Sequence, residues 1–374
     1  MAVRNPFKAS LGANPYALVG RDNVLAEMEF ALDNGPGTHE RVSVIVGPRG
    51  IGKTVTLNAI EQLALGRGWR YFSETATEGF SERLRTAVIR TLMQLSPPRS
   101  SLTGTQLGHI GISTRKDDVD TPPLDLRAAL TELLAAQREE STRVHQEPTG
   151  VLITLDELHH LTASEIVEFA AIIQHLIRED ADVAVVFAGI PSSVSGLLSD
   201  EAGSNPITFL RRANRINLGP ISDGAVEIGL TAPTEASGVT WEADALARAV
   251  AACGGYPFMV QLVGQWSFFY RSDTVIDSSA VDQGIAKAQE KLGHLVHEPA
   301  LADLSPRDRE FLLAMAKDDG PSTIGDIAER TGMSASNASN YRRRLLDAQI
   351  IAETPGNTLT FTLPYLREYL RSQQ

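Results

Sequence analysis

Short apolar runs alternate with segments of helical periodicity over the first 220 residues. The first run reads RVSVIV and is followed directly by a glycine. The predicted strands cover Arg41–Val46, Trp69–Ser73, Val151–Leu155, Val183–Ala188 and Arg215–Leu218, and the predicted helices cover Leu57–Ala64, Phe80–Leu95, Leu126–Arg138 and Ser164–Arg178. Strands that are apolar throughout and alternate with helices predict an α/β fold, with a parallel five-stranded sheet covered on both faces.

The pattern changes twice along the chain. Residues 96–123 are rich in Pro, Gly, Ser and Thr, and we expect them to form a mobile surface insertion. Strands stop after Pro220 and residues 221–295 have a helical pattern, in which three helices are predicted over Glu242–Ala252, Pro257–Tyr270 and Ser278–Leu292. The sequence therefore predicts a lead segment at 1–40, an α/β core at 41–220, a helical lid at 221–303 and a last unit at 304–374.

The last unit has the pattern of a winged helix-turn-helix. Ser305 and Pro306 are a typical N-cap and first residue of a helix. A second short helix ends at Gly332, and a third follows it after a tight turn. The predicted elements are helices from Ser305, over Thr323–Arg330 and over Ser334–Ala348, and a hairpin of Ile350–Glu353 and Leu359–Thr362 around Pro355–Asn357.

A phosphate-binding motif follows the first predicted strand. The eight residues are Gly47, Pro48, Arg49, Gly50, Ile51, Gly52, Lys53 and Thr54, and they fit G-x-x-x-x-G-K-[ST] at every defined position. The glycines allow backbone N–H groups to surround a phosphate, and Lys53 places a cation on the β- and γ-phosphate oxygens. Thr54 offers a hydroxyl to Mg²⁺. The helix that begins near Lys53 directs its positive end at the anion.

Two carboxylates end the third predicted strand. Asp156 and Glu157 follow the apolar run VLITL, about 100 residues after the phosphate-binding motif. In ATPases with such a motif, an Asp at a strand end holds Mg²⁺ and an adjacent Glu orients and deprotonates the attacking water. We therefore predict that Asp156 holds magnesium and that Glu157 is the general base.

The charge distribution limits where nucleic acid can bind. The net charge of the chain is −12, and residues 305–374 contain nine basic and nine acidic residues. All of the excess acid therefore lies in residues 1–304, which repel a nucleic-acid backbone. The single cysteine, Cys253, excludes an internal disulfide, and no apolar stretch is long enough for a membrane span. We expect a cytoplasmic protein.

The two nucleotide motifs, the sheet pattern and the C-terminal helices resemble the AAA+ superfamily of ATPases. The resemblance is to the origin-recognition-type and archaeal-type ATPases, including the signal-transducing STAND class. The segment Asn14–Leu32, NPYALVGRDNVLAEMEFAL, resembles the box that covers adenine in these proteins. The resemblance implies that Leu18, Val19 and Gly20 touch the base. It also implies ATP/ADP and Mg²⁺ as ligands.

Three further segments carry over from the resemblance. The end of VAVVFAGIPSS matches a sensor strand, which implies that Ser192 or Ser193 senses the γ-phosphate. The segment FLRRANRINLGPIS implies an arginine finger at Arg211 or Arg212, directed at a neighbouring copy in a homo-oligomer. Gly254–Gly264 matches the Gly-x-Pro start of a lid helix, with Pro257 near the nucleotide. The second sensor arginine common in these ATPases has no counterpart here, and this predicts slow hydrolysis.

The third helix of the last unit carries the candidate DNA contacts. Its small polar side chains suit base edges and its arginines suit phosphates. The candidate residues are Ser336, Asn337, Asn340, Arg343 and Arg344. Asn337 and Asn340 are three apart, and we expect Arg343 and Arg344 to extend the same face. A winged helix that contacts protein remains an alternative.

The sequence as a whole predicts an ATP-hydrolysing molecular switch that controls a DNA-binding winged helix. One alternative is a STAND-type signalling ATPase, whose winged helix makes protein contacts. A kinase with a phosphate-binding loop and a nucleotide-stabilised scaffold with little turnover are two others. The paired carboxylates of Asp156 and Glu157 favour hydrolysis over phosphoryl transfer to a small molecule.

Overall fold

The computed structural model describes residues 3–10, 12–95, 124–143, 149–158, 163–190, 211–302 and 304–373. The predicted insertion 96–123 and the sensor candidates Ser192 and Ser193 lie outside these described residues.

A five-stranded parallel sheet forms the centre of the first 220 residues, as the sequence predicts. The strands are β1 (Val42–Val46), β2 (Arg70–Thr75), β3 (Val151–Asp156), β4 (Val183–Gly189) and β5 (Asn214–Asn217). Their order across the sheet is β2-β3-β4-β1-β5, and every neighbouring pair is parallel. The strand that bears the phosphate-binding motif, β1, is therefore separated from the acidic strand β3 by β4.

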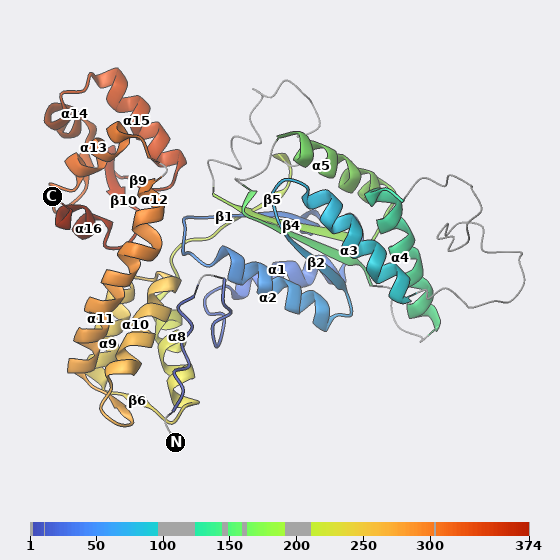
Figure 1. Ribbon diagram of the computed structural model, residues 1–374, viewed down its shortest axis with the longest axis horizontal. Helices are drawn as coiled ribbons and strands as arrows, with labels where there is room; N and C mark the ends of the chain where they lie inside the picture. The colour runs from blue at the N-terminus through green and yellow to red at the C-terminus, as the bar shows by residue number, and fades with distance from the viewer. Residues whose placement is uncertain are drawn as a thin grey trace, which may run out of the picture.

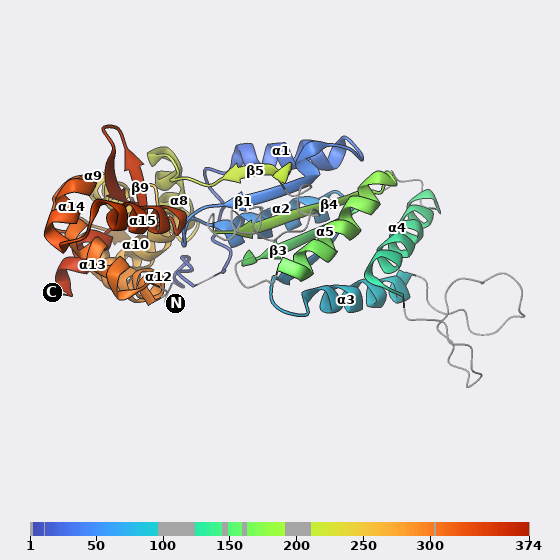
Figure 2. The ribbon, with the colours of Figure 1, turned by 90° about the horizontal axis from the view of Figure 1, so that it is seen from above.

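Helices cover both faces of the sheet. Figure 2 shows α1 (Asp22–Asp33) and α2 (Lys53–Gly66) on one side, and α3 (Phe80–Leu95), α4 (Leu126–Arg143) and α5 (Ala163–Arg178) on the other. The pleat of β1 explains why two cores form, because successive side chains point to opposite faces. Ile45 is buried in the core that contains α2, whereas Val44 and Val46 are buried in the core that contains α3 and α5.

Residues 223–302, which we name the helical unit, follow the sheet. The unit contains α8 (Asp223–Glu235), α9 (Ala243–Cys253), α10 (Pro257–Tyr270), α11 (Ser278–Leu292), the π-helical turn η5 (Gly293–His297) and α12 (Glu298–Ala302). The prediction that strands stop after Pro220 is wrong. Two parallel strands, β6 (Thr240–Trp241) and β7 (Val275–Ile276), precede α9 and α11. Each has two residues, which is too short to produce a periodicity in the sequence.

The helix that begins at Ser278 continues without a break through η5 to Ala302 and connects the helical unit to the residues after 304. Its π-helical turn packs against the last helix of the protein, because a side chain at Gly293 would collide with the Tyr369 ring. His297 is buried beside the same ring, and its Nε2 lies 2.9 Å from the Pro364 carbonyl oxygen. Burial lowers the pKa of His297 to about 4, so this imidazole is neutral at physiological pH.

Residues 306–372 form what we name the C-terminal unit. Its elements are α13 (Pro306–Met315), β8 (Ser322–Thr323), α14 (Ile324–Thr331), α15 (Ala335–Asp347), β9 (Ile351–Thr354), β10 (Thr358–Phe361) and α16 (Leu366–Ser372). Ser305 caps α13, and its hydroxyl and the Asp308 carboxylate form a reciprocal capping box. The strands form an antiparallel sheet in the order β8-β10-β9.

The helical unit and the C-terminal unit lie together at one end of the molecule, and the α/β layers lie at the other (Figure 1). One continuous apolar core runs from the α2 face of the sheet through the helical unit into the C-terminal unit. None of the described helices combines the length and the apolar composition that crossing a membrane requires.

Candidate functional site

The phosphate-binding motif forms a loop, residues 47–54, between the end of β1 at Val46 and the start of α2 at Lys53. We name it the phosphate loop. Gly50 has a φ of +74°, and an added side chain would lie 2.1 Å from the Tyr256 hydroxyl oxygen. Only glycine suits this position, because the backbone conformation and the close approach both exclude a Cβ atom.

Lys53 folds back over the loop that contains it. Its Nζ donates hydrogen bonds to the carbonyl oxygens of Gly47, at 2.8 Å, and Pro48, at 3.0 Å. Burial is the largest influence on the pKa of this ammonium and, together with the nearby charge of Arg49, lowers it to about 8 against the opposing effect of the Asp156 and Glu157 carboxylates. Lys53 is therefore a half-buried cation whose charge an arriving phosphate would stabilise.

Thr54 and Asp156 connect the two motifs. The Thr54 hydroxyl donates a hydrogen bond to Asp156 Oδ2 at 2.5 Å, across 102 positions of sequence. A second contact below them fixes α2 against β3, because the Thr154 hydroxyl donates to the buried carboxylate of Glu61 at 2.5 Å. A hydroxyl and a carboxylate oxygen that meet beside a phosphate loop are oxygen donors of the kind that Mg²⁺ prefers, and water and phosphate oxygens would complete its shell.

Glu157 follows Asp156 at the end of β3 in an uncommon backbone conformation. Its φ is +63°, and its N–H donates to Asp156 Oδ1 at 2.8 Å. A non-glycine residue in the left-handed region costs free energy that the surrounding contacts must offset, and such residues cluster at functional sites. The conformation turns the chain directly after the acidic strand, where the sequence places a general base.

Two family models match the chain. One, the AAA ATPase domain, covers residues 17–186, and the other, a domain of unknown function (DUF8462), covers residues 294–370. The match to the first model includes the phosphate loop, both carboxylates, three of the five strands and the first part of β4. This part of the chain is an AAA ATPase domain. The predicted resemblance to AAA+ ATPases is therefore confirmed.

Three solved structures are similar to this chain, and the first of them shows the same fold. The Walker-type ATPase PABY2304 of Pyrococcus abyssi is 16% identical, with a TM-score of 0.64, and the match covers 95% of this chain and 96% of that one. RuvB R170A of Thermotoga maritima is 16% identical, covers 98% of this chain and 99% of that one, and has a TM-score of 0.49. CDC6P of Pyrobaculum aerophilum is 17% identical, covers 98% and 97%, and has a TM-score of 0.45. No curated protein matches the chain.

Arg21 supports the phosphate loop of the AAA ATPase domain from the lead segment. It is 8% exposed, and its Nη2 donates to the carbonyl oxygens of Ile51, at 3.1 Å, and Gly219, at 2.8 Å. Burial lowers the pKa of this guanidinium. The sequence analysis quoted the Gly-Arg-Asp box but did not assign a role to Arg21. The only signal for it was its place in that box, since its partners are 30 and 198 positions away.

The predicted adenine contacts lie against the helical unit. A side chain at Gly20 would meet Ile221, and Val19 lies 3.3 Å from where a Gly229 side chain would begin on α8. Pro257 is the first residue of α10 and is half-buried. The residue before it, Tyr256, is buried and donates its hydroxyl hydrogen to the carbonyl oxygen of Arg49. The sequence analysis did not assign Tyr256 a role.

The arginine-finger candidates lie at the amino ends of the strands, whereas the phosphate loop lies at their carboxyl ends. Arg211 and Arg212 are exposed and precede β5, whose Asn214 pairs with Ser43 near the amino end of β1. The Arg212 carbonyl oxygen lies 2.6 Å from His39 Nε2, just before β1. The phosphate loop begins at the other end of β1. The structure therefore does not bring these arginines to the phosphate loop of their own chain.

Arg343 and Arg344, the two arginines expected to extend the face of Asn337 and Asn340, differ in their contacts. Arg344 donates to Asp308 Oδ2 at 2.8 Å, and Asp308 belongs to α13 and is 1% exposed. Arg343 is exposed and makes no ion pair with any residue that the structure describes. Residues three and four positions after Asn340 both lie beside it on a helix, so the expected face stays a prediction, but the Arg344 guanidinium is already engaged by α13. Ser336, Asn337 and Asn340 are exposed.

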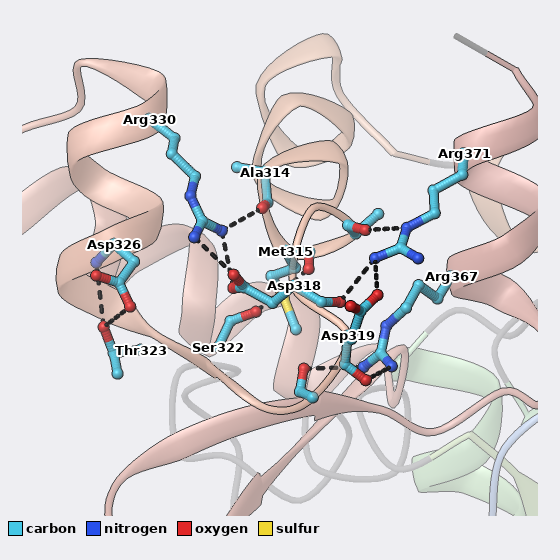
Figure 3. Close-up of polar contacts among 12 residues, drawn as sticks. Ala314, Met315, Asp318, Asp319, Ser322, Thr323, Asp326, Arg330, Arg367 and Arg371 are labelled. Carbon is cyan, nitrogen blue, oxygen red and sulfur yellow. Dashed lines mark hydrogen bonds and ion pairs between the residues drawn. The ribbon is translucent and has the colours of Figure 1, made fainter.

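Most arginines of the C-terminal unit make internal contacts. Figure 3 shows the loop after α13 held from two sides: Arg330 pairs with Asp318, Arg371 pairs with Asp319, and Arg367 donates to the carbonyl oxygens of Asp319 and Gly320. On α15, Arg342 pairs with Glu353 of β9. These side chains hold elements of the unit together, so they are less available to a nucleic-acid backbone.

A cavity of about 350 Å³ lies between the phosphate loop and the C-terminal unit. Arg49 and Ile190, which follow β1 and β4, line it from the AAA ATPase domain. Asp308 and Arg344 line it from the other side. Nucleotide-binding and C-terminal elements therefore share one boundary.

Proposed function

We propose that the protein binds and hydrolyses ATP with Mg²⁺ and acts as a switch that controls its C-terminal unit. The observation that carries this proposal is the hydrogen bond between Thr54 and Asp156 beside the phosphate loop. This contact joins the phosphate loop to the acidic end of β3 at the carboxyl ends of the strands, where ligands of α/β folds bind, and it supports a shared magnesium–phosphate site there. The helical unit, residues 223–302, would serve as the lid.

Each residue of this site has a defined task in the proposed reaction. The amides of the phosphate loop and Lys53 hold the phosphates, and the magnesium ion would be held by Thr54 and Asp156. Glu157 orients the attacking water and takes its proton. Since residues 254–264, at the start of α10, contain no arginine that could act as a second sensor, we propose that turnover is slow.

ATP affinity should fall as the pH rises above about 8. Lys53 must be charged to bind phosphate, and its pKa is about 8 before nucleotide arrives. Bound phosphate raises that pKa, so binding takes up a proton, and affinity is highest below about 8 and declines by up to about tenfold per pH unit above it. Isothermal titration at pH 7.5, 8.5 and 9.5, in buffers of different ionisation enthalpy, measures both affinity and proton uptake.

The Lys53→Arg variant is the matched control for this pH dependence. Arginine stays charged throughout the range, so the affinity of the variant should not change with pH, whatever its absolute value. A wild-type protein whose affinity is constant up to pH 9.5 would show that the charge of Lys53 is not needed for binding.

We further propose that the C-terminal unit is a winged helix that binds DNA through α15. The order of its helices and strands, with the β9–β10 hairpin as the wing, supports this reading. Ser336, Asn337 and Asn340 are exposed on α15, and Arg343 is the exposed cation beside them. Because Arg344 is paired with Asp308, we expect it to contribute less to DNA affinity than its position in the sequence suggests.

The variant Arg343→Ala should weaken binding to all DNA sequences and lower the salt slope by about one charge. Asn340→Ala should chiefly change the preference among sequences, because amide side chains read base edges. Fluorescence anisotropy on random and genomic duplexes, across a salt series and with or without ATP, measures both effects. Lys317→Ala is the control, since Lys317 is an exposed cation in the loop after α13 and does not belong to α15.

A STAND-type signalling ATPase is the second candidate function, and the internal pairing of the arginines favours it. In that case the C-terminal unit makes protein contacts and the protein retains ADP after purification. Absence of DNA binding at low salt, in both nucleotide states, would select this candidate and leave the ATPase proposal unchanged.

We also propose that a homo-oligomer forms through the surface at the amino ends of the strands, where Arg211 and Arg212 lie. Their position far from their own phosphate loop supports action on a neighbouring copy. A side chain placed at the amino ends of the strands can reach only a nucleotide that a second chain presents to it.

A further inference from the structure

A turn at the start of α10 delivers Tyr256 to the phosphate loop. Gly254 and Gly255 have φ values of +54° and +71°, and a side chain at Gly255 would lie 2.5 Å from the Ile221 carbonyl oxygen. The Ile221 N–H donates to the Gly255 carbonyl oxygen at 2.8 Å. The turn is therefore anchored to the segment that joins β5 to the helical unit, and this anchor fixes the backbone position of Tyr256.

The Tyr256 side chain then reaches the middle of the phosphate loop. It is 3% exposed, and its hydroxyl donates to the carbonyl oxygen of Arg49, 207 positions earlier in the chain. Gly50 makes the approach possible, because any side chain there would occupy the position of the hydroxyl. The glycine at this position is not required by the motif G-x-x-x-x-G-K-[ST], in which it is one of the unspecified residues.

The contact determines where one amide of the loop points. In a trans peptide the carbonyl of one residue and the N–H of the next point in opposite directions. Holding the Arg49 carbonyl outward therefore turns the Gly50 N–H inward, toward the phosphates. Arg21 has the same effect on the Gly52 N–H, because it holds the carbonyl of the preceding residue, Ile51.

Lys53 differs from these two anchors. It holds the carbonyls of Gly47 and Pro48 and must leave them to reach a phosphate. The Tyr256 hydroxyl has no such second task, because it is buried against the loop and burial raises its pKa. It is a neutral donor that can keep its carbonyl while nucleotide arrives and leaves.

We propose that Tyr256 is a positioning residue, carried by the helical unit, that presets the phosphate loop for anion binding. The inference rests on the proposed nucleotide-binding function. Because α10 begins at Pro257, displacement of the helical unit from the sheet withdraws the hydroxyl and lowers phosphate affinity. Engagement of the helical unit and nucleotide affinity are thus coupled through one hydrogen bond.

The test compares Tyr256→Phe with Tyr365→Phe. The first variant keeps the ring and removes the hydroxyl, which should weaken ATP and ADP binding about 5- to 30-fold, as expected when a buried carbonyl loses its donor. Tyr365 is a matched control, because its hydroxyl also donates to a backbone carbonyl, that of Ala252, at 2.7 Å but away from the loop. Tyr365→Phe should change ATP affinity less than about twofold.

Amide hydrogen exchange without nucleotide provides the second measurement. Residues 49–53 should exchange faster in Tyr256→Phe and at the wild-type rate in Tyr365→Phe. Unchanged exchange and unchanged ATP affinity in Tyr256→Phe would overturn the proposal, and so would equal affinity losses in the two variants. If the wild-type protein does not bind ATP, the proposed function fails, and the exchange rates still decide whether Tyr256 orders the loop.

Discussion

Replacing Lys53 with alanine should weaken ATP binding at least about 100-fold, to below detection in an ordinary titration. The side chain is the cation of the phosphate loop, and a hydrogen bond to a charged group contributes up to about 3 kcal/mol. The effect has a second cause, since Lys53 also holds the carbonyls of Gly47 and Pro48 before nucleotide binds. Isothermal titration with ATP and Mg²⁺ is the measurement.

Lys317→Ala is the appropriate control for this variant. It removes one positive charge from an exposed position of the C-terminal unit, so the net charge changes equally while the loop is intact. Unchanged ATP affinity in Lys53→Ala would refute the assignment of the phosphate loop. A similar loss in both variants would instead point to a long-range effect of net charge.

Replacing Glu157 with glutamine should retain bound ATP and slow its hydrolysis about 100-fold or more. The carboxamide has nearly the same shape but cannot accept the proton of the attacking water, and general-base catalysis contributes about 10²–10⁴ in rate. Binding should be preserved because, in the proposed site, the loop and Lys53 hold the phosphates and Thr54 and Asp156 hold magnesium. Phosphate release under single-turnover conditions, together with ATP titration, separates the two steps.

Glu168→Gln serves as the control, since Glu168 is an exposed carboxylate on α5 of the same domain. Its hydrolysis rate should match that of the wild type. Turnover of Glu157→Gln within a few-fold of wild type would exclude Glu157 as the base and require another group to activate the water.

The local parts of the site could be predicted from sequence because their chemistry is contiguous. Phosphate binding requires the spacing from Gly47 to Thr54, and the acidic pair follows directly after an apolar strand. Helix boundaries were predictable for the same reason: Pro257–Tyr270 and Ser278–Leu292 are bounded by residues with strong local preferences, and both are observed with those bounds.

The parts that were not predicted depend on contacts between distant segments. The position of β4 between β1 and β3 follows from packing, which no single strand encodes. Arg21 precedes the phosphate loop in the sequence and Tyr256 follows it by about 200 residues. Nothing in either residue type indicates that its side chain will donate to a backbone carbonyl of that loop. The pairing of Arg344 with Asp308 was missed for a related reason, because a helical wheel shows which residues share a face and not what lies opposite them.

The unbroken helix from Ser278 to Ala302 is long enough that a small tilt at one end would displace the other end by several ångströms. At about 1.5 Å per residue this rod is roughly 35 Å long, and its far end joins the C-terminal unit. A tilt of about 10° at the α10 end would therefore carry the C-terminal unit through about 6 Å, as simple geometry requires. In the proposed switch this rod would act as a lever arm, so that a displacement at the nucleotide too small to break the packing of α10 would become a movement comparable to one helical turn at the other end.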